Sequence, residues 1–182
     1  MITSKADYRE YLRRDMTFYN QFGRKEKLMC RLTREPLYLI AKYVRLLRKE
    51  EYFANSGKWR YRRFSLLLIV AMKNSLGNRL GFRIPRNCFG PGLTIYHHGE
   101  IIVNENARIG ADCKLHGGNC IGNNGKSQSV PHIGDGLDLG IGAKIIGDVT
   151  LGNNITVGAN AVVTRSFGED DLTLVGVPAM KK

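Results

Sequence analysis

The chain has 182 residues, of which 43% are hydrophobic and 24% are charged, and its formal net charge is +12. This length allows one domain of ordinary size, with or without a small helical appendage, and excludes a large multidomain assembly. The longest apolar run, residues 66–72, is far shorter than the roughly 20 residues that cross a bilayer, which excludes a transmembrane helix there.

The first residues and the cysteines bear on localisation. The opening sequence MITSKAD lacks the basic segment and apolar core of an export signal. The four cysteines, Cys30, Cys88, Cys113 and Cys120, show no C-x-x-C spacing and are typical of free thiols in a reducing compartment. We therefore expect a cytoplasmic protein without disulfides.

Charge and glycine content both change near residue 81. Residues 1–80 hold 19 of the 28 Lys and Arg but only 7 of the 16 Asp and Glu, so this part alone accounts for the net charge. Only 3 of the 21 glycines precede residue 81. We therefore predict a basic α-helical N-terminal region over residues 1–80 and a separate domain over residues 81–182.

The N-terminal region mixes charged and apolar residues at helical spacing from residue 5 to 54. Pro36 suits the first turn of one helix. The apolar stripe of that helix consists of Leu37, Ile40, Ala41, Val44 and Leu47. The basic residues off this stripe are Lys42, Arg45, Arg48 and Lys49. A further segment begins with Arg60, Arg62 and Arg63 and continues into the apolar run.

Two roles fit these helices. They can cap the end of the following domain, with the surplus charge on a solvated face. They can also attach the protein peripherally to an anionic membrane, because basic amphipathic helices bind such surfaces. The two roles are compatible. Nucleic-acid binding suits the net charge, but no recognised motif supports it, and we predict none.

A six-residue repeat fills the second half of the chain. The aliphatic positions run without a gap through Ile133, Leu139, Ile145, Leu151, Val157 and Val163, and four of the six precede glycine. Six residues at about 3.3 Å each form one short strand and a corner, so three repeats complete a triangular coil. A β-sandwich would instead show turn signals every 8–12 residues. The repeat predicts a mainly β fold, a left-handed parallel β-helix.

The repeat is interrupted twice. Two extra residues lie between Ile95 and Val103, next to His97 and His98, and about six extra polar residues lie between repeats in residues 121–133. The register points His97 outward from the prism. Histidine exchanges protons near neutral pH, which suits a general base. Loops on a rigid scaffold often form sites, so both interruptions are candidate site elements.

At these residues the chain resembles the serine O-acetyltransferase branch of the hexapeptide acyltransferases, and more closely its short members from capsule and exopolysaccharide synthesis. The resemblance covers residues 81–182 well and the arrangement of residues 5–80 more loosely. Its strongest matches are His97 with 99–103, then 121–127, 131–134 and 175–179.

This resemblance implies an acetyl-CoA-dependent O-acetyltransferase that works as a homotrimer, with sites between neighbouring prisms. His97 would be the general base, and backbone N–H groups at Gly122 and Asn123 would stabilise the oxyanion. The residues matching contacts to acetyl-CoA are Ile141 and Ala159 at the pantetheine arm and Thr164, Arg165 and Lys181 at the nucleotide end. Glu105 is our candidate for holding or polarising His97.

Three departures from the serine enzymes bear on the acceptor. Phe82 and Tyr96 stand where those enzymes have Asp, and Ser129–Val130 replaces an Arg-His pair. These charged groups are expected to hold serine and to steer the base. We therefore predict a saccharide hydroxyl in polysaccharide biosynthesis as the acceptor. Serine O-acetylation in cysteine biosynthesis is the alternative, and a trimeric assembly module without activity is the non-enzymatic one.

A metal site is the remaining alternative for the histidines. The β-helix carbonic anhydrases, a related architecture, bind zinc through three histidines across a trimer interface. The spacing of His97, His116 and His132 does not clearly suit that arrangement. We predict no metal, and structural or subunit-contact roles for His98 and His116.

Overall fold

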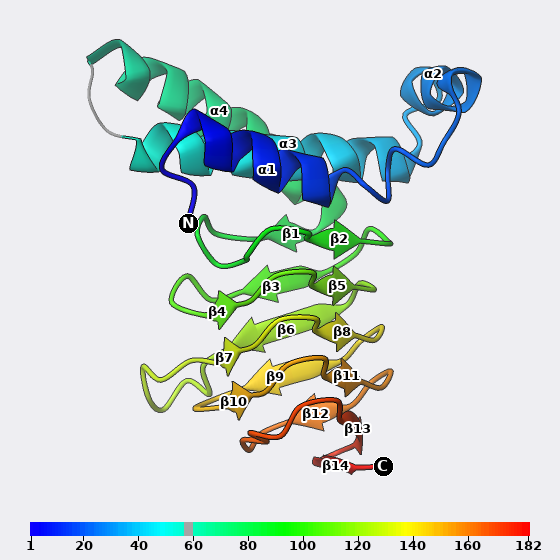
Figure 1. Ribbon diagram of the computed structural model, residues 1–182, viewed down its shortest axis with the longest axis vertical. Coiled ribbons are helices and arrows are strands. Elements are labelled where there is room, and N and C mark those ends of the chain that lie inside the picture. The colour runs from blue at the N-terminus through cyan, green and yellow to red at the C-terminus, as the bar shows by residue number, and fades with distance from the viewer. Residues whose placement is uncertain (57–59) are drawn as a thin grey trace.

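A layer of helices lies across one end of a stack of short strands (Figure 1). The computed structural model describes residues 1–56 and 60–182, without the side chains of residues 60–63, so the basic start of the last predicted helical segment lies partly outside the described residues. The helices are α1 (Lys5–Asp15), α2 (Arg24–Leu32), α3 (Pro36–Asn55) and α4 (Arg60–Leu80).

The starts of α1 and α3 follow from local sequence features. Ser4 caps α1 by accepting a hydrogen bond from the backbone N–H of Asp7, whose carboxylate accepts one in return from Ser4. Pro36 occupies the first turn of α3. The predicted apolar stripe of α3 is confirmed, because four of its five residues are buried and Leu37 packs against the same core.

The strands form three mostly parallel sheets, which we call sheets A, B and C. Sheet A contains β1 (Phe82–Arg83), β3 (Ile101–Val103), β6 (Asn119–Gly122), β9 (Lys144–Ile146) and β12 (Val162–Val163). Sheet B contains β4 (Arg108–Ile109), β7 (His132–Ile133) and β10 (Thr150–Leu151). Sheet C contains β2 (Thr94–Ile95), β5 (Lys114–Leu115), β8 (Asp138–Leu139), β11 (Thr156–Val157), β13 (Thr173–Gly176) and the antiparallel β14 (Ala179–Lys181).

The chain visits sheets C, A and B in turn, so each circuit forms one coil of a three-sided prism. Ile95, Leu115, Leu139 and Val157 stack in successive coils of sheet C and are buried. Their spacings are 20, 24 and 18 residues. The regular coil therefore has 18 residues, and the two longer coils contain the two predicted interruptions. The parallel β-helix is the observed architecture, and its left-handed winding stays a prediction.

The helical layer and the prism share one apolar core, because buried residues of α3, α4 and the first coils form a single cluster. The helices cover the end of the prism, as expected of a cap (Figure 1). The change from helix to strand falls between Leu80 and Phe82, where charge and glycine content change in the sequence. Among the described helices, none is long and apolar enough to cross a membrane.

Arg48 joins the two parts and departs from its expected position on a solvated face. Its side chain is fully buried and its Nε donates to Asp15 at 2.7 Å. It also donates to Glu51 and to the carbonyls of Phe89 and Gly90 in the first coil. The period of the helix put Arg48 off the apolar stripe, but α1 and the first coil enclose that side as well.

Candidate active site

His97 lies in the two-residue insertion that follows β2. Its side chain and that of His98 are exposed. The insertion is held below the helices, since the N–H of Gly99 donates to the carbonyl of Leu80 at 2.9 Å. Gly81 permits this close approach, because a Cβ at Gly81 would lie 3.0 Å from the carbonyl of Gly99. His97 thus lies outside the prism, on a segment of backbone that is anchored to the end of α4.

A column of residues continues from His97 down one edge of the prism, between sheets C and A. We call it the CA edge, and it comprises His97, Gly117, Ile141 and Ala159. A Cβ at Gly117 would lie 3.7 Å from the Cβ of His97. Backbone hydrogen bonds of 2.8 Å join Gly142 to Gly117 and Asn160 to Ile141. The structure therefore brings three of the predicted site residues onto one edge.

The CA edge is open and partly apolar. Ile141 is 57% exposed although it is a large aliphatic residue, and Ala159 is exposed too. The column ends at Gly176, followed by Val177, which is 70% exposed. Single exposed apolar residues are common, but here they follow one another along the edge that begins at His97. This track suits an extended molecule with an apolar arm.

A second group of predicted residues lies on another edge, between sheets A and B. This AB edge comprises Glu105, Gly122, Asn123, Thr164 and Arg165, as the pairing of β3, β6, β9 and β12 requires. Sheet A separates the two edges. Glu105 and His97 therefore stand on different edges, and no hydrogen bond or ion pair joins them among the described residues. The structure does not bring this predicted pair together within one chain.

The six-residue insertion leaves the prism from the AB edge, after β6. Its start is held by local hydrogen bonds: Asn123 donates to the carbonyl of Ser127 at 3.0 Å, and the Asn124 side chain accepts from the N–H groups of Lys126 and Ser127. The loop returns to sheet B at His132, which is exposed and pairs with Arg108 in the strand register. His132 thus lies on a different sheet from the column below His97.

Lys181 and Arg165 lie near the end of the prism farthest from the helices. Lys181 belongs to β14 and forms an ion pair with Glu169. The Arg165 guanidinium lies 5.2 Å from the ring centre of Phe167 and 2.6 Å from the sulfur of Met180. These two cations therefore share one end of the molecule, near the C-terminal strand.

Sequence reasoning missed a ladder of side chains on the outer face of sheet C. The Phe18 and Tyr96 rings meet edge-to-face at 5.0 Å, and the Tyr96 ring lies 4.6 Å from His116. His116 Nε2 is 2.9 Å from a carboxylate oxygen of Asp138. Lys114 also approaches Asp138, at 3.7 Å. The strand register could have revealed this ladder, because it pairs β5 with β8 across a 24-residue coil.

The histidines do not assemble into a metal site within the chain. Within residues 1–56 and 60–182, no group of three or more His, Cys, Asp or Glu side chains is arranged to hold a metal ion. His97, His116 and His132 occupy an edge, the face of sheet C and sheet B respectively.

Similarity to known proteins agrees with this fold. No family model matches the chain. A protein of Escherichia coli (strain K12), assigned as the colanic acid biosynthesis acetyltransferase WcaB, is 39% identical over 113 residues, which are 56% of this chain and 69% of the relative. The chain belongs to the serine acetyltransferase-like hexapeptide acyltransferases. This confirms the family predicted from the repeat and its interruptions.

The serine acetyltransferases themselves are longer relatives of this family. The enzyme of Synechococcus elongatus is 33% identical over 91 residues, which are 49% of this chain and 37% of that protein. The one of Staphylococcus xylosus is 35% identical over 91 residues and 42% of its length. The chain thus spans about two fifths of the length of these serine acetyltransferases.

Solved structures extend the likeness to the helices. A serine acetyltransferase from Brucella abortus superposes on 98% of this chain and 70% of its own, with a TM-score of 0.69 and 18% identity. One from Neisseria gonorrhoeae covers 98% of this chain and 68% of its own, with a TM-score of 0.68 and 23% identity. At this identity the likeness shows the fold: a helical N-terminal layer on stacked parallel strands.

Proposed function

We propose that this chain is an acetyl-CoA-dependent O-acetyltransferase that acetylates a saccharide hydroxyl in polysaccharide biosynthesis. The observation that carries the proposal is the CA edge, where exposed His97 stands at the head of an open column with Ile141 and Ala159. The WcaB relative supports the same class of reaction, because it is assigned as an acetyltransferase and this chain spans 69% of it.

His97 would act as a general base. Its imidazole takes the proton of the acceptor hydroxyl while that oxygen attacks the thioester carbonyl carbon. When the carbon–sulfur bond breaks, the imidazolium returns the proton to the departing thiolate. Proton and charge therefore balance within one ternary complex, and the chain supplies no nucleophile of its own.

The donor would lie along the CA edge. The exposed side chains of Ile141 and Val177 offer apolar surface to a pantetheine arm. A solved serine acetyltransferase in complex with CoA shares the fold with a TM-score of 0.63 and 24% identity, covering 81% of this chain and 59% of its own. Lys181 near the far end, and Arg165 on the AB edge of the neighbouring chain in a trimer, would offer cations to the nucleotide phosphates.

A homotrimer would complete the site. In one chain, sheet A separates the His97 edge from the edge that carries Gly122, Asn123 and Thr164. Left-handed prisms packed side by side around a threefold axis would set the CA edge of one chain against the AB edge of its neighbour. The N–H groups of Gly122 and Asn123 would then face the developing oxyanion across the interface.

The surroundings of His97 support a saccharide as the acceptor. Phe82 is buried, and the ring of Tyr96 is engaged by Phe18 and His116, so neither replaces the missing carboxylates. Among the described residues, no ion pair or hydrogen bond links His97 to a carboxylate. A saccharide hydroxyl needs hydrogen bonds but no paired charges, which supports it over serine. The reaction would take place in the cytoplasm, where the free thiols persist.

Release of CoA from acetyl-CoA tests the proposal, with nucleotide sugars, glycan lipids and L-serine as acceptors. We expect turnover with a saccharide acceptor and a fall of about 10²- to 10⁴-fold in His97→Asn, the usual contribution of a general base. His98→Asn is the matched control, because His98 is the exposed neighbour. Unchanged turnover in His97→Asn would overturn the assignment of the base.

Two outcomes would favour the alternatives. Turnover with L-serine alone would make the chain a serine O-acetyltransferase, as its longer relatives are named. Absence of acetyl-CoA binding by calorimetry, together with a trimeric mass in solution, would favour an assembly module without activity.

A further inference from the structure

Helix α2 stands at one end of the helical layer, away from the strands (Figure 1). None of its nine residues is buried. A helix of this length is marginal by itself in water and depends on packing for its stability. Three of its large apolar side chains are nevertheless left in solvent: Leu28 is 56% exposed, Met29 58% and Leu32 69%. An apolar helix face is therefore uncovered in the single chain.

These three side chains lie on one face. At 3.6 residues per turn, Leu28, Met29 and Leu32 fall within about 100° of the helix circumference. Arg24 and Arg31 border this arc on one side, and Lys25 lies inside it at the N-terminal end. Residues 24–34 carry five Lys or Arg and a single acid, Glu26. The Glu26 carboxylate accepts a hydrogen bond from the N–H of Gly23, at the start of the helix.

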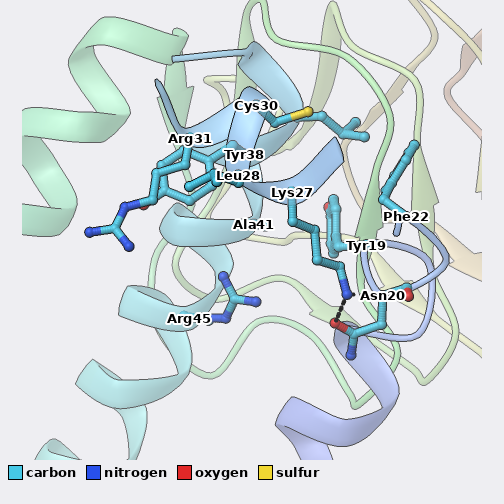
Figure 2. A pocket seen from close by; sticks show the side chains of 11 residues that line it. Tyr19, Asn20, Phe22, Lys27, Leu28, Cys30, Arg31, Tyr38, Ala41 and Arg45 are labelled. Carbon is cyan, nitrogen blue, oxygen red and sulfur yellow. Dashed lines mark hydrogen bonds between the residues drawn. The ribbon is translucent and has the colours of Figure 1, made fainter. Parts of the chain in front are cut away.

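The opposite face of α2 is only loosely supported by the body of the protein. Between α2 and α3 lies a cavity of about 280 Å³, into which Tyr19, Phe22 and Arg45 project from the body (Figure 2). Lys27 crosses this space and donates to the side chain and carbonyl of Asn20 at 3.4 and 3.3 Å. From α2 the cavity is lined by Lys27, Leu28, Cys30 and Arg31. Leu28 and Arg31 therefore lie between the cavity and the exposed face, and Met29 and Leu32 are not among the lining residues.

We propose that α2 docks on the surface of an anionic lipid bilayer. Leu28, Met29 and Leu32 would enter the boundary between headgroups and acyl chains, and Arg24, Lys25 and Arg31 would meet the lipid phosphates. Charge complementarity selects this partner, since residues 1–80 carry the whole net charge of +12 while the prism is neutral. Binding of this kind needs no catalysis, so the proposal stands apart from the acetyltransferase assignment.

A second copy of the chain fits this face less well. Each partner of a stable protein interface contributes about 20–30 residues. The nine residues of α2 offer three apolar side chains with three cations on or beside them. Two such faces would bring like charges together, whereas an anionic bilayer neutralises them.

Co-sedimentation of the full chain with vesicles tests the proposal. One set contains phosphatidylcholine alone, and the other contains equal parts of phosphatidylcholine and phosphatidylglycerol. We expect binding to the anionic set that weakens as salt rises. The double variant Leu28→Ser, Leu32→Ser should bind anionic vesicles at least tenfold more weakly than the unchanged chain. The double variant Arg24→Gln, Lys25→Gln should also bind more weakly, with a larger loss at low salt than at high salt.

The matched control is Leu67→Ser with Leu68→Ser on α4, two apolar side chains that are 65% and 49% exposed. This pair should bind vesicles like the unchanged chain, and circular dichroism should show that both double variants keep their helix content. Equal loss in both pairs would overturn the proposal. Failure of the unchanged chain to bind anionic vesicles would also overturn it. If the chain does not bind vesicles and the Leu28→Ser, Leu32→Ser variant forms a smaller assembly, the α2 face would instead be a contact with a second copy of the chain.

Discussion

His116 Nε2 lies 2.9 Å from a carboxylate oxygen of Asp138, one coil below it on the outer face of sheet C. The contact fixes the ring that supports Tyr96, and Tyr96 directly precedes His97. The serine enzymes are expected to have a carboxylate at the position of Tyr96. In this chain an aromatic ring stands there instead, and an imidazole–carboxylate pair supports that ring.

Asp138→Asn should therefore slow the proposed reaction, because it loosens His116 and Tyr96 and so displaces His97. Both side chains of the contact are about one-third exposed, so its loss should lower the free energy of unfolding by less than about 1 kcal/mol. A displacement of about 1 Å at a catalytic group can cost up to ~10²-fold in rate, and we expect kcat to fall by roughly tenfold or more, with KM for acetyl-CoA nearly unchanged.

Lys114→Ala is the control for that measurement. Lys114 also contacts Asp138, whereas the ring that lies against Tyr96 is that of His116. We expect its kcat to stay within about twofold of the unchanged enzyme, since exposed ion pairs contribute little. Equal effects of the two substitutions on kcat would contradict a positioning role for the His116–Asp138 pair.

Arg48 should dominate the stability of the junction between helices and prism. Arg48→Met leaves the carboxylates of Asp15 and Glu51 buried without their cation. Breaking a buried pair in this way costs about 3–5 kcal/mol. Urea unfolding at a fixed protein concentration, followed by circular dichroism, measures the change. Arg13→Ala, which removes an exposed pair with Glu10, should cost less than about 1 kcal/mol.

The importance of Arg48 was not predictable from helical periodicity. The apolar stripe of α3 was correct at every position, because one face of that helix packs on the core. Asp15, which is also fully buried, accepts hydrogen bonds from the N–H groups of Gly92 and Leu93 in addition to Arg48. These partners lie 77 and 78 residues away in the chain, a separation that no local pattern reports.

The six-residue repeat predicted more of the prism than helical periodicity predicted of the helical layer. It predicted the coils, both insertions and an outward His97, because each coil repeats the same geometry. The same register also places Ile141 and Ala159 below His97. The register also places Glu105 one edge away from His97, so the repeat itself already argued against that pair. Sites between subunits lie beyond this reasoning, since a repeat describes one prism and not the packing of its neighbours.

The thiols bear on any assay that detects released CoA with a thiol reagent. Burial raises the pKa of Cys88 to about 11, and burial also raises the pKa of Cys113. The thiolate is the reactive form, so both should stay unreactive at pH 8 in the folded chain. Cys30 and Cys120 are partly exposed. We expect at most two thiols to react before unfolding and four after it, and Cys30→Ser should remove one of the early ones.

Acid should weaken the start of α1 through Asp7. Hydrogen bonds from Thr3 and Ser4 lower the pKa of the Asp7 carboxyl from 3.8 to about 2. A carboxyl whose pKa is lower in the folded state stabilises the fold fully above its unfolded pKa, and that contribution disappears as pH falls through about 2. Asp7→Asn removes the titrating group, and its neutral amide oxygen accepts the bonds from Thr3 and Ser4 more weakly than the carboxylate does. The thermal midpoint of the variant should therefore lie below that of the unchanged chain at pH 5, and the two midpoints should converge as the pH approaches 2. A constant difference between pH 5 and pH 2 would contradict this role of Asp7.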